Sequence, residues 1–402
     1  MGHYIFLTGL YLPKPGATGM CVHAVAKELT NRGHIVKVIC YDNKEEKKHE
    51  SEIETIRVHV PFFLKHHYSI FKQKLAYCIS LVCKFLHIIN YPLRSSSLVK
   101  NYYSALEKAY KEYGGDKNSP KIIASFTPFE AVFAGYKFKL KHPNSKLYYY
   151  STDTLSNEGG KSRFLPIKTR NKLGLKWEKR FFDVYDVLII MNCHKQYYYS
   201  DKFASYINKM RLSNFPLFRP NSYKKTSPNL NIVYAGTLYK RIRNPRYACT
   251  VLTELVKKTD FTVFFLGSGD CDEILKETEK ISDGRIKNLG MQDYGIAQSY
   301  LSQAMVLLSI GNFGTDMTPS KIYEYISTGK PIIHFYSCDN DLCLEPLNLY
   351  GNCLLVKEGN ANVDEVIRFC KKANQIPLEQ FKDNFVNSTP SFTADIIEHD
   401  NL

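Results

Sequence analysis

Short apolar runs alternate with helix-length segments along the whole chain, and this alternation predicts βα units built on parallel sheets. The runs that predict strands in the first half are YIFLTGL (4–10), IVKVICY (35–41), IRVHV (56–60), KIIASF (121–126), KLYYYS (146–151) and VLIIMN (187–192). Those in the second half are IVYAGTL (232–238), FTVFFLG (261–267), IKNLG (286–290), MVLLSIG (305–311), PIIHF (331–335) and CLLV (353–356). The pattern therefore predicts an α/β fold.

A polar passage with three prolines, NFPLFRPNSYKKTSPNLN (214–231), interrupts the alternation and predicts a linker between two domains. We therefore expect a first Rossmann-like domain over 1–215 and a second over 216–376, followed by a final segment, 377–402. In open α/β sheets ligands bind at the carboxyl ends of the strands, so a cleft between the two domains is the expected site.

Length and composition agree with this division. A chain of 402 residues fits two domains of ordinary size, and 44% hydrophobic with 23% charged residues is typical of a soluble globular protein. The formal net charge of +15 indicates attraction to phosphate-rich partners. Nucleotides, anionic lipid surfaces and nucleic acid all meet that description.

No targeting or membrane-spanning segment is expected. The start, MGHYIFLTGLYLPKPG, lacks a basic region and a small-residue cleavage site, and it predicts a first strand rather than a signal peptide. The apolar run 75–90 contains Lys84 and His87 and is shorter than the roughly 20 residues that span a bilayer. The eleven cysteines form no Cys-x-x-Cys pair or Cys/His cluster with zinc spacing, which favours reduced thiols in the cytoplasm.

Two loops after predicted strands carry features that suit a phosphate. In YLPKPGATGM (11–20), Gly16 and Gly19 allow the backbone to approach a ligand beside a helix start, although a plain strand-to-helix turn explains the same residues. In YAGTLYKRIRNP (234–245), Arg241 and Arg243 are placed at the carboxyl end of a strand, and a solvated basic loop is the alternative.

The stretch DMTPSKIYEYISTGKPII (316–333) predicts a helix with an unusual start. Thr318 can cap it and a proline suits its first turn, so Ser320 and Lys321 would present a hydroxyl, N–H groups and an ammonium at the positive end of the dipole. A lysine there costs electrostatic stability unless an anion is bound. Glu324 lies one turn later, where pairing with Lys321 is its ordinary role.

At these residues the sequence resembles the GT-B glycosyltransferases, in particular the retaining nucleotide-sugar enzymes that carry two acidic residues with seven residues between them. Asp316 and Glu324 have that spacing, although the family usually has Glu at the first position. Further matching segments are GATGMCVHAVAKELTNRGHIVKVI, YAGTLYKRIRNP, FFLGSGD and IKNLGMQDYGIAQSYLSQAMVLLSI. The resemblance implies two Rossmann-like domains with parallel sheets that face each other across a central cleft. It also implies that 377–402 cross back to the first domain; a frayed terminus is the alternative.

The resemblance also implies roles for single positions. Glu324 would bind the ribose hydroxyls of the donor nucleotide and Asp316 the donor sugar. The diphosphate would be held by the 318–321 helix start, which includes Ser320 and Lys321, with help from Arg241 or Arg243 and the loop at Gly16. The turn at Gly267 would belong to the donor site, and the backbone around Met291 would border the base. The family often has an arginine where this chain has Thr237.

Acidic residues after two other predicted strands are further candidates for the site. Asp153, in YYYSTDTLSNEGG, follows a strand where related enzymes place a residue that faces the acceptor, and a capping Asp is the equal alternative. Asp270 and Asp272 form an Asp-x-Asp pattern that suits a metal, but acids at a helix start usually cap it. Because N–H groups, Lys321 and an arginine can stabilise a leaving diphosphate, we expect no metal or other cofactor.

Residues 63–103 mix Lys, Arg and His with large apolar side chains, a composition that suits a helix at a lipid interface. Two helices packed inside the first domain are the alternative. The segment leads us to expect a cytoplasmic protein that is peripheral on the inner face of the cell membrane.

Together these features predict a glycosyltransferase that moves a sugar from a UDP- or GDP-sugar to a glycan or lipid-linked acceptor in surface polysaccharide biosynthesis. Retention of configuration is implied by the resemblance alone. A nucleotide-sugar epimerase on a similar fold is the second enzyme hypothesis. A nucleic-acid-binding protein would explain the charge, but the sequence has no recognised nucleic-acid module and its basic residues are spread widely, so we expect no such partner.

Overall fold

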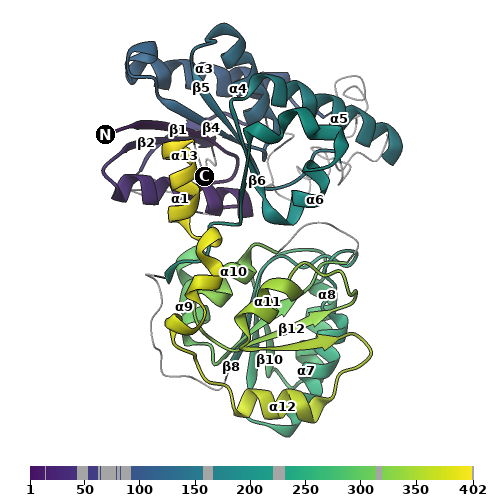
Figure 1. Cartoon of the computed structure of the whole chain (residues 1–402). Coiled ribbons are helices and arrows are strands. Elements are labelled where there is room, and N and C mark those ends of the chain that lie inside the picture. Colours follow the sequence, from purple (N-terminus) through teal and green to yellow (C-terminus); the bar gives the residue numbers. More distant parts are fainter. Residues whose placement is uncertain are drawn as a thin grey trace. The chain divides into compact units, whose positions relative to one another are not determined.

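The computed structural model describes residues 1–13, 15–42, 53–61, 64, 78, 82, 92–156, 166–220, 231–313 and 319–400. The chain forms two compact units (Figure 1). Unit 1 contains Met1–Pro216 together with Pro390–Leu402, and unit 2 contains Leu217–Thr389. Residues 378–388, which form two short 3₁₀ turns, therefore belong to unit 2, whereas the last helix belongs to unit 1.

Unit 1 is built on a seven-stranded sheet in the order β3-β2-β1-β4-β5-β6-β7, and every neighbouring pair is parallel. Its strands are β1 His3–Leu7, β2 Ile35–Tyr41, β3 Glu54–Val58, β4 Lys121–Ser125, β5 Lys146–Ser151, β6 Val187–Met191 and β7 Met210–Ser213. Its helices are α1 Ala17–Asn31, α3 Ser96–Glu112, α4 Phe129–Lys141, α5 Ile167–Val184, α6 Lys195–Tyr198 and α13 Pro390–His399.

Unit 2 repeats the plan with a six-stranded parallel sheet in the order β10-β9-β8-β11-β12-β13. Its strands are β8 Asn231–Ala235, β9 Thr262–Leu266, β10 Ile286–Gly290, β11 Val306–Ile310, β12 Ile332–Tyr336 and β13 Cys353–Lys357. Its helices are α7 Arg246–Lys258, α8 Asp272–Ile281, α9 Tyr294–Gln303, α10 Lys321–Ile326, α11 Leu344–Tyr350 and α12 Val363–Lys371.

Helices cover both faces of each sheet, which is why the strands are near-continuous apolar runs rather than alternating ones. In unit 1, β6 is buried at every position, and residues of α3, α4 and α5 share one core cluster with the sheet. Helix α13 lies beside α1, where Figure 1 draws it in yellow next to purple. In unit 2 a core cluster joins the sheet to α7, α8 and α12.

The fold class predicted from the alternation is confirmed, since both units are parallel sheets flanked by helices. Each predicted strand is present, with ends that shift by a few residues. Strand β7 was not predicted. It has four residues, includes Arg211 and lies at the edge of its sheet, so it lacks the apolar run that marks the central strands.

Candidate functional site

The strand order of each unit reverses direction once. In unit 2 the chain moves outward from β8 through β9 to β10, then returns to the other side of β8 at β11. The loops that follow β8 and β11 therefore diverge at the carboxyl edge, and a crevice at such a switch point is where open parallel sheets bind ligands. The corresponding point of unit 1 lies between β1 and β4.

Arg243 spans the switch point of unit 2. Its Nε–H and Nη2–H groups donate to Asn312 Oδ1 at 3.0 and 2.8 Å, and Nη1–H donates to the Thr237 carbonyl oxygen at 3.2 Å. Asn312 follows β11 and is buried, whereas Thr237 and Arg243 follow β8. The guanidinium is thus oriented from both sides of the switch point, whereas Arg241 in the same loop is exposed.

Glycines let the backbones of this edge approach closely. A Cβ at Gly267 would overlap the carbonyl oxygen of Gly236, and one at Gly269 would overlap that of Leu238. Gly236 and Gly267 line a small pocket with Ser268 and the start of α8. The Gly267 N–H donates to the Gly290 carbonyl oxygen at 2.8 Å, so the ends of β8, β9 and β10 are drawn together.

Met291 follows the end of β10 and is 55% exposed. The preceding residue, Gly290, has a φ of 65°, a left-handed conformation that favours glycine. Its N–H donates to Asn288 Oδ1 at 3.1 Å, which fixes the turn. The side chain of Met291 is consequently presented at the carboxyl edge of unit 2.

Helix α10 begins at Lys321, two residues later than a helix capped by Thr318 would begin. Its N-cap is Ser320, whose side chain makes no capping hydrogen bond, and the expected cap Thr318 lies outside the described residues, as does Asp316. The Tyr325 hydroxyl accepts from the Ala235 N–H at 2.8 Å and donates to the Ala235 carbonyl oxygen at 3.2 Å. Two hydrogen bonds therefore tie this helix to the end of β8.

Glu324 is held between two helices. Its Oε1 accepts from Gln298 Nε2 of α9 at 2.5 Å, and its side chain is only 13% exposed. The Lys321 ammonium lies 4.0 Å from Oε2, so the one-turn pairing is present but long. Lys321 itself is 39% exposed. Burial, and then the Glu324 carboxylate, raise the pKa of the nearby Tyr294.

Asp270 accepts from the Lys240 N–H at 2.7 Å through Oδ1, while Asp272 lies in the first turn of α8. Asp270 therefore supports the turn that carries Lys240 to Arg243. These are the ordinary roles of acids near a helix start.

Unit 1 places Gly16 and Asp153 on loops that meet. Gly16 is the N-cap of α1, and its N–H donates to the Leu10 carbonyl oxygen at 3.2 Å. Asp153 follows β5 and is half-buried. The hydroxyls of Thr18 and Thr152 lie 3.1 Å apart and are buried, so they join the first turn of α1 to the residue before Asp153.

The Asp153 loop is supported by Glu178 of α5, which is fully buried. Its Oε1 accepts from the Leu155 N–H at 2.8 Å and from the Tyr198 hydroxyl at 2.9 Å, and Oε2 accepts from Ser156. Burial raises the pKa of Glu178. Glu178 therefore fixes the chain just after Asp153.

Among residues 63–103 the structure describes 64, 78, 82 and 92–103. Within that part Leu98, Val99 and Tyr102 of α3 belong to the core of unit 1, so their apolar face packs on protein. The remainder of the proposed lipid-facing segment lies outside the described residues. No helix that the structure describes has both the length and the apolar character to cross a membrane.

The predicted donor-site residues of unit 2 that the structure describes all come from segments that follow strands at one edge or from the start of α10. They are Arg241, Arg243, Gly267, Met291, Ser320, Lys321 and Glu324. Asn312, Gln298 and Tyr325, which orient them, were not predicted. The only available signal was a polar residue directly after a buried strand, as in SIGN (309–312).

No model of a known protein family matches this chain, and no curated protein matches it in sequence. Solved structures do match it. Sucrose-phosphate synthase from Thermosynechococcus elongatus is 13% identical with a TM-score of 0.59, over 99% of this chain and 94% of that one. HepE from Anabaena, in complex with UDP and glucose, is 14% identical with a TM-score of 0.56, over 98% and 95%. WaaG, a glycosyltransferase involved in lipopolysaccharide biosynthesis, is 13% identical with a TM-score of 0.56, over 98% and 100%.

These likenesses show the fold, which is the two-unit GT-B architecture that the sequence resemblance implied. The same fold also serves other chemistry. A UDP-N-acetylglucosamine 2-epimerase matches with a TM-score of 0.51 at 11% identity, over 96% of this chain and 90% of that one. The fold therefore does not determine the reaction, which depends on the residues of the site.

Proposed function

We propose that this protein is a glycosyltransferase that moves a sugar from a nucleotide-diphosphate donor to a glycan or lipid-linked acceptor. The observation that carries the proposal is Arg243, whose guanidinium is held across the switch point of unit 2 by Asn312 and the Thr237 carbonyl. An oriented cation at that edge suits a diphosphate, because guanidinium N–H groups match phosphate oxygens.

The remaining donor contacts follow from the same edge. Glu324, oriented by Gln298, accepts hydrogen bonds from the ribose hydroxyls, and the backbone near Met291 borders the base. Asp316 contacts the donor sugar. The complex of HepE with UDP and glucose supports a UDP-sugar as the first donor to test, since that protein shares the fold.

Sugar transfer requires stabilisation of the charge that develops on the leaving diphosphate. Arg243 and the half-exposed Lys321 supply positive charge, and the hydroxyl and backbone N–H of Ser320, at the start of α10, supply hydrogen bonds. Arg241 and Thr318 complete this set. We propose that these groups act on the diphosphate without a metal ion.

On the acceptor side, Asp153 faces the attacking hydroxyl, and Glu178 keeps its loop in place through the Leu155 N–H. The net charge of +15 favours an acceptor that is anionic or held at an anionic surface. We therefore propose an acceptor in surface polysaccharide biosynthesis, at the inner face of the membrane. Transfer with retention is proposed from the sequence resemblance alone.

A donor panel tests the proposal. The purified full chain is incubated with UDP- and GDP-sugars, and nucleotide binding and donor hydrolysis are followed by calorimetry and mass detection. We expect one nucleotide class to bind. Glu324→Gln should weaken that binding about tenfold or more, because a ribose hydroxyl loses a charged acceptor. Glu365→Gln, an exposed acid of α12, is the matched control. Absence of binding to every donor would contradict the proposal.

The epimerase hypothesis is favoured by one observation, the shared fold of the 2-epimerase. The two activities leave different products. A transferase releases free nucleotide diphosphate at a rate that depends on acceptor, whereas an epimerase isomerises the sugar without any acceptor. If isomerised donor forms in the absence of acceptor, the protein is an epimerase and the transferase proposal is wrong.

A further inference from the structure

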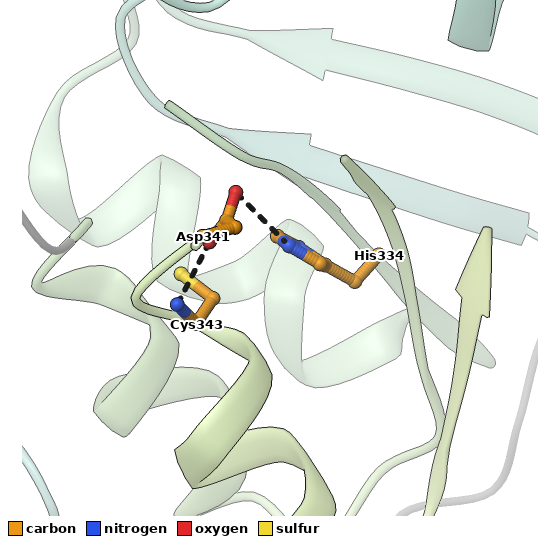
Figure 2. Close-up of side chains that lie close together, drawn as sticks. All are labelled: His334, Asp341 and Cys343. Carbon is orange, nitrogen blue, oxygen red and sulfur yellow. Dashed lines mark hydrogen bonds and ion pairs between the residues drawn. The ribbon is translucent and has the colours of Figure 1, made fainter. Parts of the chain in front are cut away.

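Three potential metal ligands meet inside unit 2, and none of them is among the proposed donor contacts. They are His334 of β12, Asp341 in the following turn and Cys343 just before α11 (Figure 2). One nitrogen of the imidazole, one carboxylate oxygen and the sulfur all lie within 4.8 Å of one another. All three residues are buried, and His334 and Cys343 are fully so.

Hydrogen bonds around the cluster leave one ring nitrogen of His334 and one carboxylate oxygen of Asp341 facing into it. His334 Nδ1 lies 2.9 Å from the Ser309 hydroxyl of β11, so the other ring nitrogen, Nε2, points to the cluster. The Cys343 N–H donates to Asp341 Oδ1 at 2.8 Å, which leaves Oδ2 facing His334. Nε2 and Oδ2 are 3.6 Å apart, and both are buried without a hydrogen-bond partner.

Two buried polar atoms that face each other without a hydrogen bond are costly unless an ion pair between them or a bound cation compensates them. We propose that His334, Asp341 and Cys343 bind a single divalent transition-metal ion, with zinc as the best match. Zinc takes imidazole nitrogen, carboxylate oxygen and thiolate sulfur at about 2.0 to 2.3 Å. A tetrahedral ion places its ligand atoms roughly 3.3 to 3.8 Å apart, a spacing that the nitrogen and oxygen have, and the sulfur lies within 4.8 Å of both.

Charge also favours a divalent ion. A neutral imidazole, a carboxylate and a thiolate together carry two negative charges, so a divalent cation makes the buried site neutral. Binding breaks the S–H bond of Cys343 and forms a metal–sulfur bond, and the thiol proton is released to solvent. Affinity should consequently fall as the pH is lowered, because protons compete for the ligand atoms.

The ion would stabilise the carboxyl edge of unit 2 by connecting the end of β11 to the turn after β12. Asp341 packs on the backbone of Gly311, where a Cβ would overlap Oδ2. Gly311 precedes Asn312, and the Cys338 thiol of the same turn donates to the Asn312 carbonyl oxygen at 3.7 Å. A metal at the cluster would therefore fix the end of β11 to the turn after β12. This role is structural, and it stands whether or not the chain transfers sugars.

The experiment measures metal content of the full chain. The protein is stripped with a chelator, given a slight excess of Zn²⁺, dialysed and analysed for metal and for thermal unfolding. We expect about one equivalent of zinc per chain and a higher Tm in the loaded form. In Cys343→Ser and His334→Gln the zinc content should fall about tenfold or more, because each variant removes one of the three proposed ligand atoms.

Cys338→Ser is the matched control, since this thiol lies in the same turn and outside the cluster. It should retain zinc as the wild type does. Should the cluster variants fail to fold, Co²⁺ binding to the wild type provides a separate test. A thiolate-to-cobalt charge-transfer band in the near ultraviolet is expected. If the wild type holds no zinc, or shows no thiolate-to-cobalt band, the proposal is wrong and the cluster is a His–Asp ion pair beside a buried thiol.

Discussion

At the scale of single residues, the orientation of one cation depends on one amide. Asn312 Oδ1 accepts two of the three hydrogen bonds through which Arg243 is held, and both residues lie next to the switch point of unit 2. An arginine without such a partner has about 2 kcal/mol of rotamer freedom to lose on binding a ligand. Asn312 thus acts as a positioning residue for the proposed diphosphate contact.

Asn312→Ala should weaken the binding of UDP or of the donor found in the panel by about tenfold, because bonds to a charged group contribute on the order of 1.5 kcal/mol or more. Titration calorimetry measures this directly. Asn312→Ala in the Arg243→Ala background should add little, since Asn312 acts only through the Arg243 side chain. Asn374→Ala, an exposed amide of unit 2, serves as the control. If Asn312→Ala and wild type bind the donor with equal affinity, Asn312 does not position Arg243 for the diphosphate.

At the scale of elements, α3 and α4 of unit 1 are joined by a charged cluster around Glu107. Its Oε1 accepts from the Tyr103 hydroxyl at 2.6 Å and from Lys141 Nζ at 3.2 Å, and lies 2.9 Å from His142 Nε2. Burial alone would raise the pKa of Glu107, but the hydrogen bonds from Tyr103, His142 and Lys141 lower it to about 2. The side chain is 12% exposed, so solvent screens the cluster only in part.

Because the folded pKa lies below the ordinary value of 4.5, the carboxylate stabilises the fold above pH 4.5, and this contribution is lost as the pH falls toward 2. Glu107→Gln should lower the free energy of unfolding at pH 7 by about 2 to 3 kcal/mol. The difference from wild type should shrink across that acidic range. Denaturant unfolding at several pH values measures it, with Asp201→Asn, an exposed acid of unit 1, as the control. A difference that does not change with pH would assign the effect to packing.

The elements of this fold were largely predictable because buried parallel strands are short apolar runs, and such runs are visible in sequence. Strand β7 was missed because it is short and at an edge, and its Arg211 donates to the Asp400 carbonyl oxygen at 3.1 Å. A partner so distant in sequence leaves no local pattern. Helix α10 starts later than predicted for a local reason. The Ile322 N–H donates to the Pro319 carbonyl oxygen, which makes a tighter turn at the start of the helix.

The site was predictable only in part. Arg243 was selected by its place after a strand, and Glu324 by spacing and resemblance, but their partners Asn312 and Gln298 depend on which loops the sheet brings together. The cysteine spacing predicted no zinc cluster. It stays a prediction, and the proposed set of His334, Asp341 and Cys343 has no such spacing, because one of its members is a carboxylate in a turn.

At the scale of the whole molecule, unit 1 is discontinuous in sequence, since its last helix comes after unit 2. Helix α13 is bound to α1 through Arg32, which donates to Asp395 at 2.5 Å and also pairs with Glu398. Lys121 Nζ of β4 donates to the Ile397 carbonyl oxygen at 2.8 Å, and the Tyr148 hydroxyl of β5 donates to the same oxygen at 3.1 Å. The helix therefore closes one face of the first sheet.

Removal of residues 390–402 should destabilise unit 1 and spare unit 2. The deletion uncovers the face that buried Ile396 and Ile397 cover, which costs several kcal/mol and lowers the Tm of unit 1 by about 10 to 20 °C. Hydrogen exchange with mass detection measures each unit separately. Protection should fall in β1 and β5 but not in β11 and β12. Removal of the last two residues alone is the control, and equal loss of protection in both units would contradict this assignment.

The discontinuity of unit 1 has a consequence for biosynthesis. A chain is made from its N-terminus, so residues 217–389 emerge complete while the first sheet still lacks α13. At about 5 to 20 residues per second, the ribosome needs on the order of ten seconds or more to add the intervening unit. During that interval the apolar face awaiting Ile396 and Ile397 is exposed on the nascent chain. We expect the unit translated second to reach its native state first, and the unit translated first to be the one that engages chaperones.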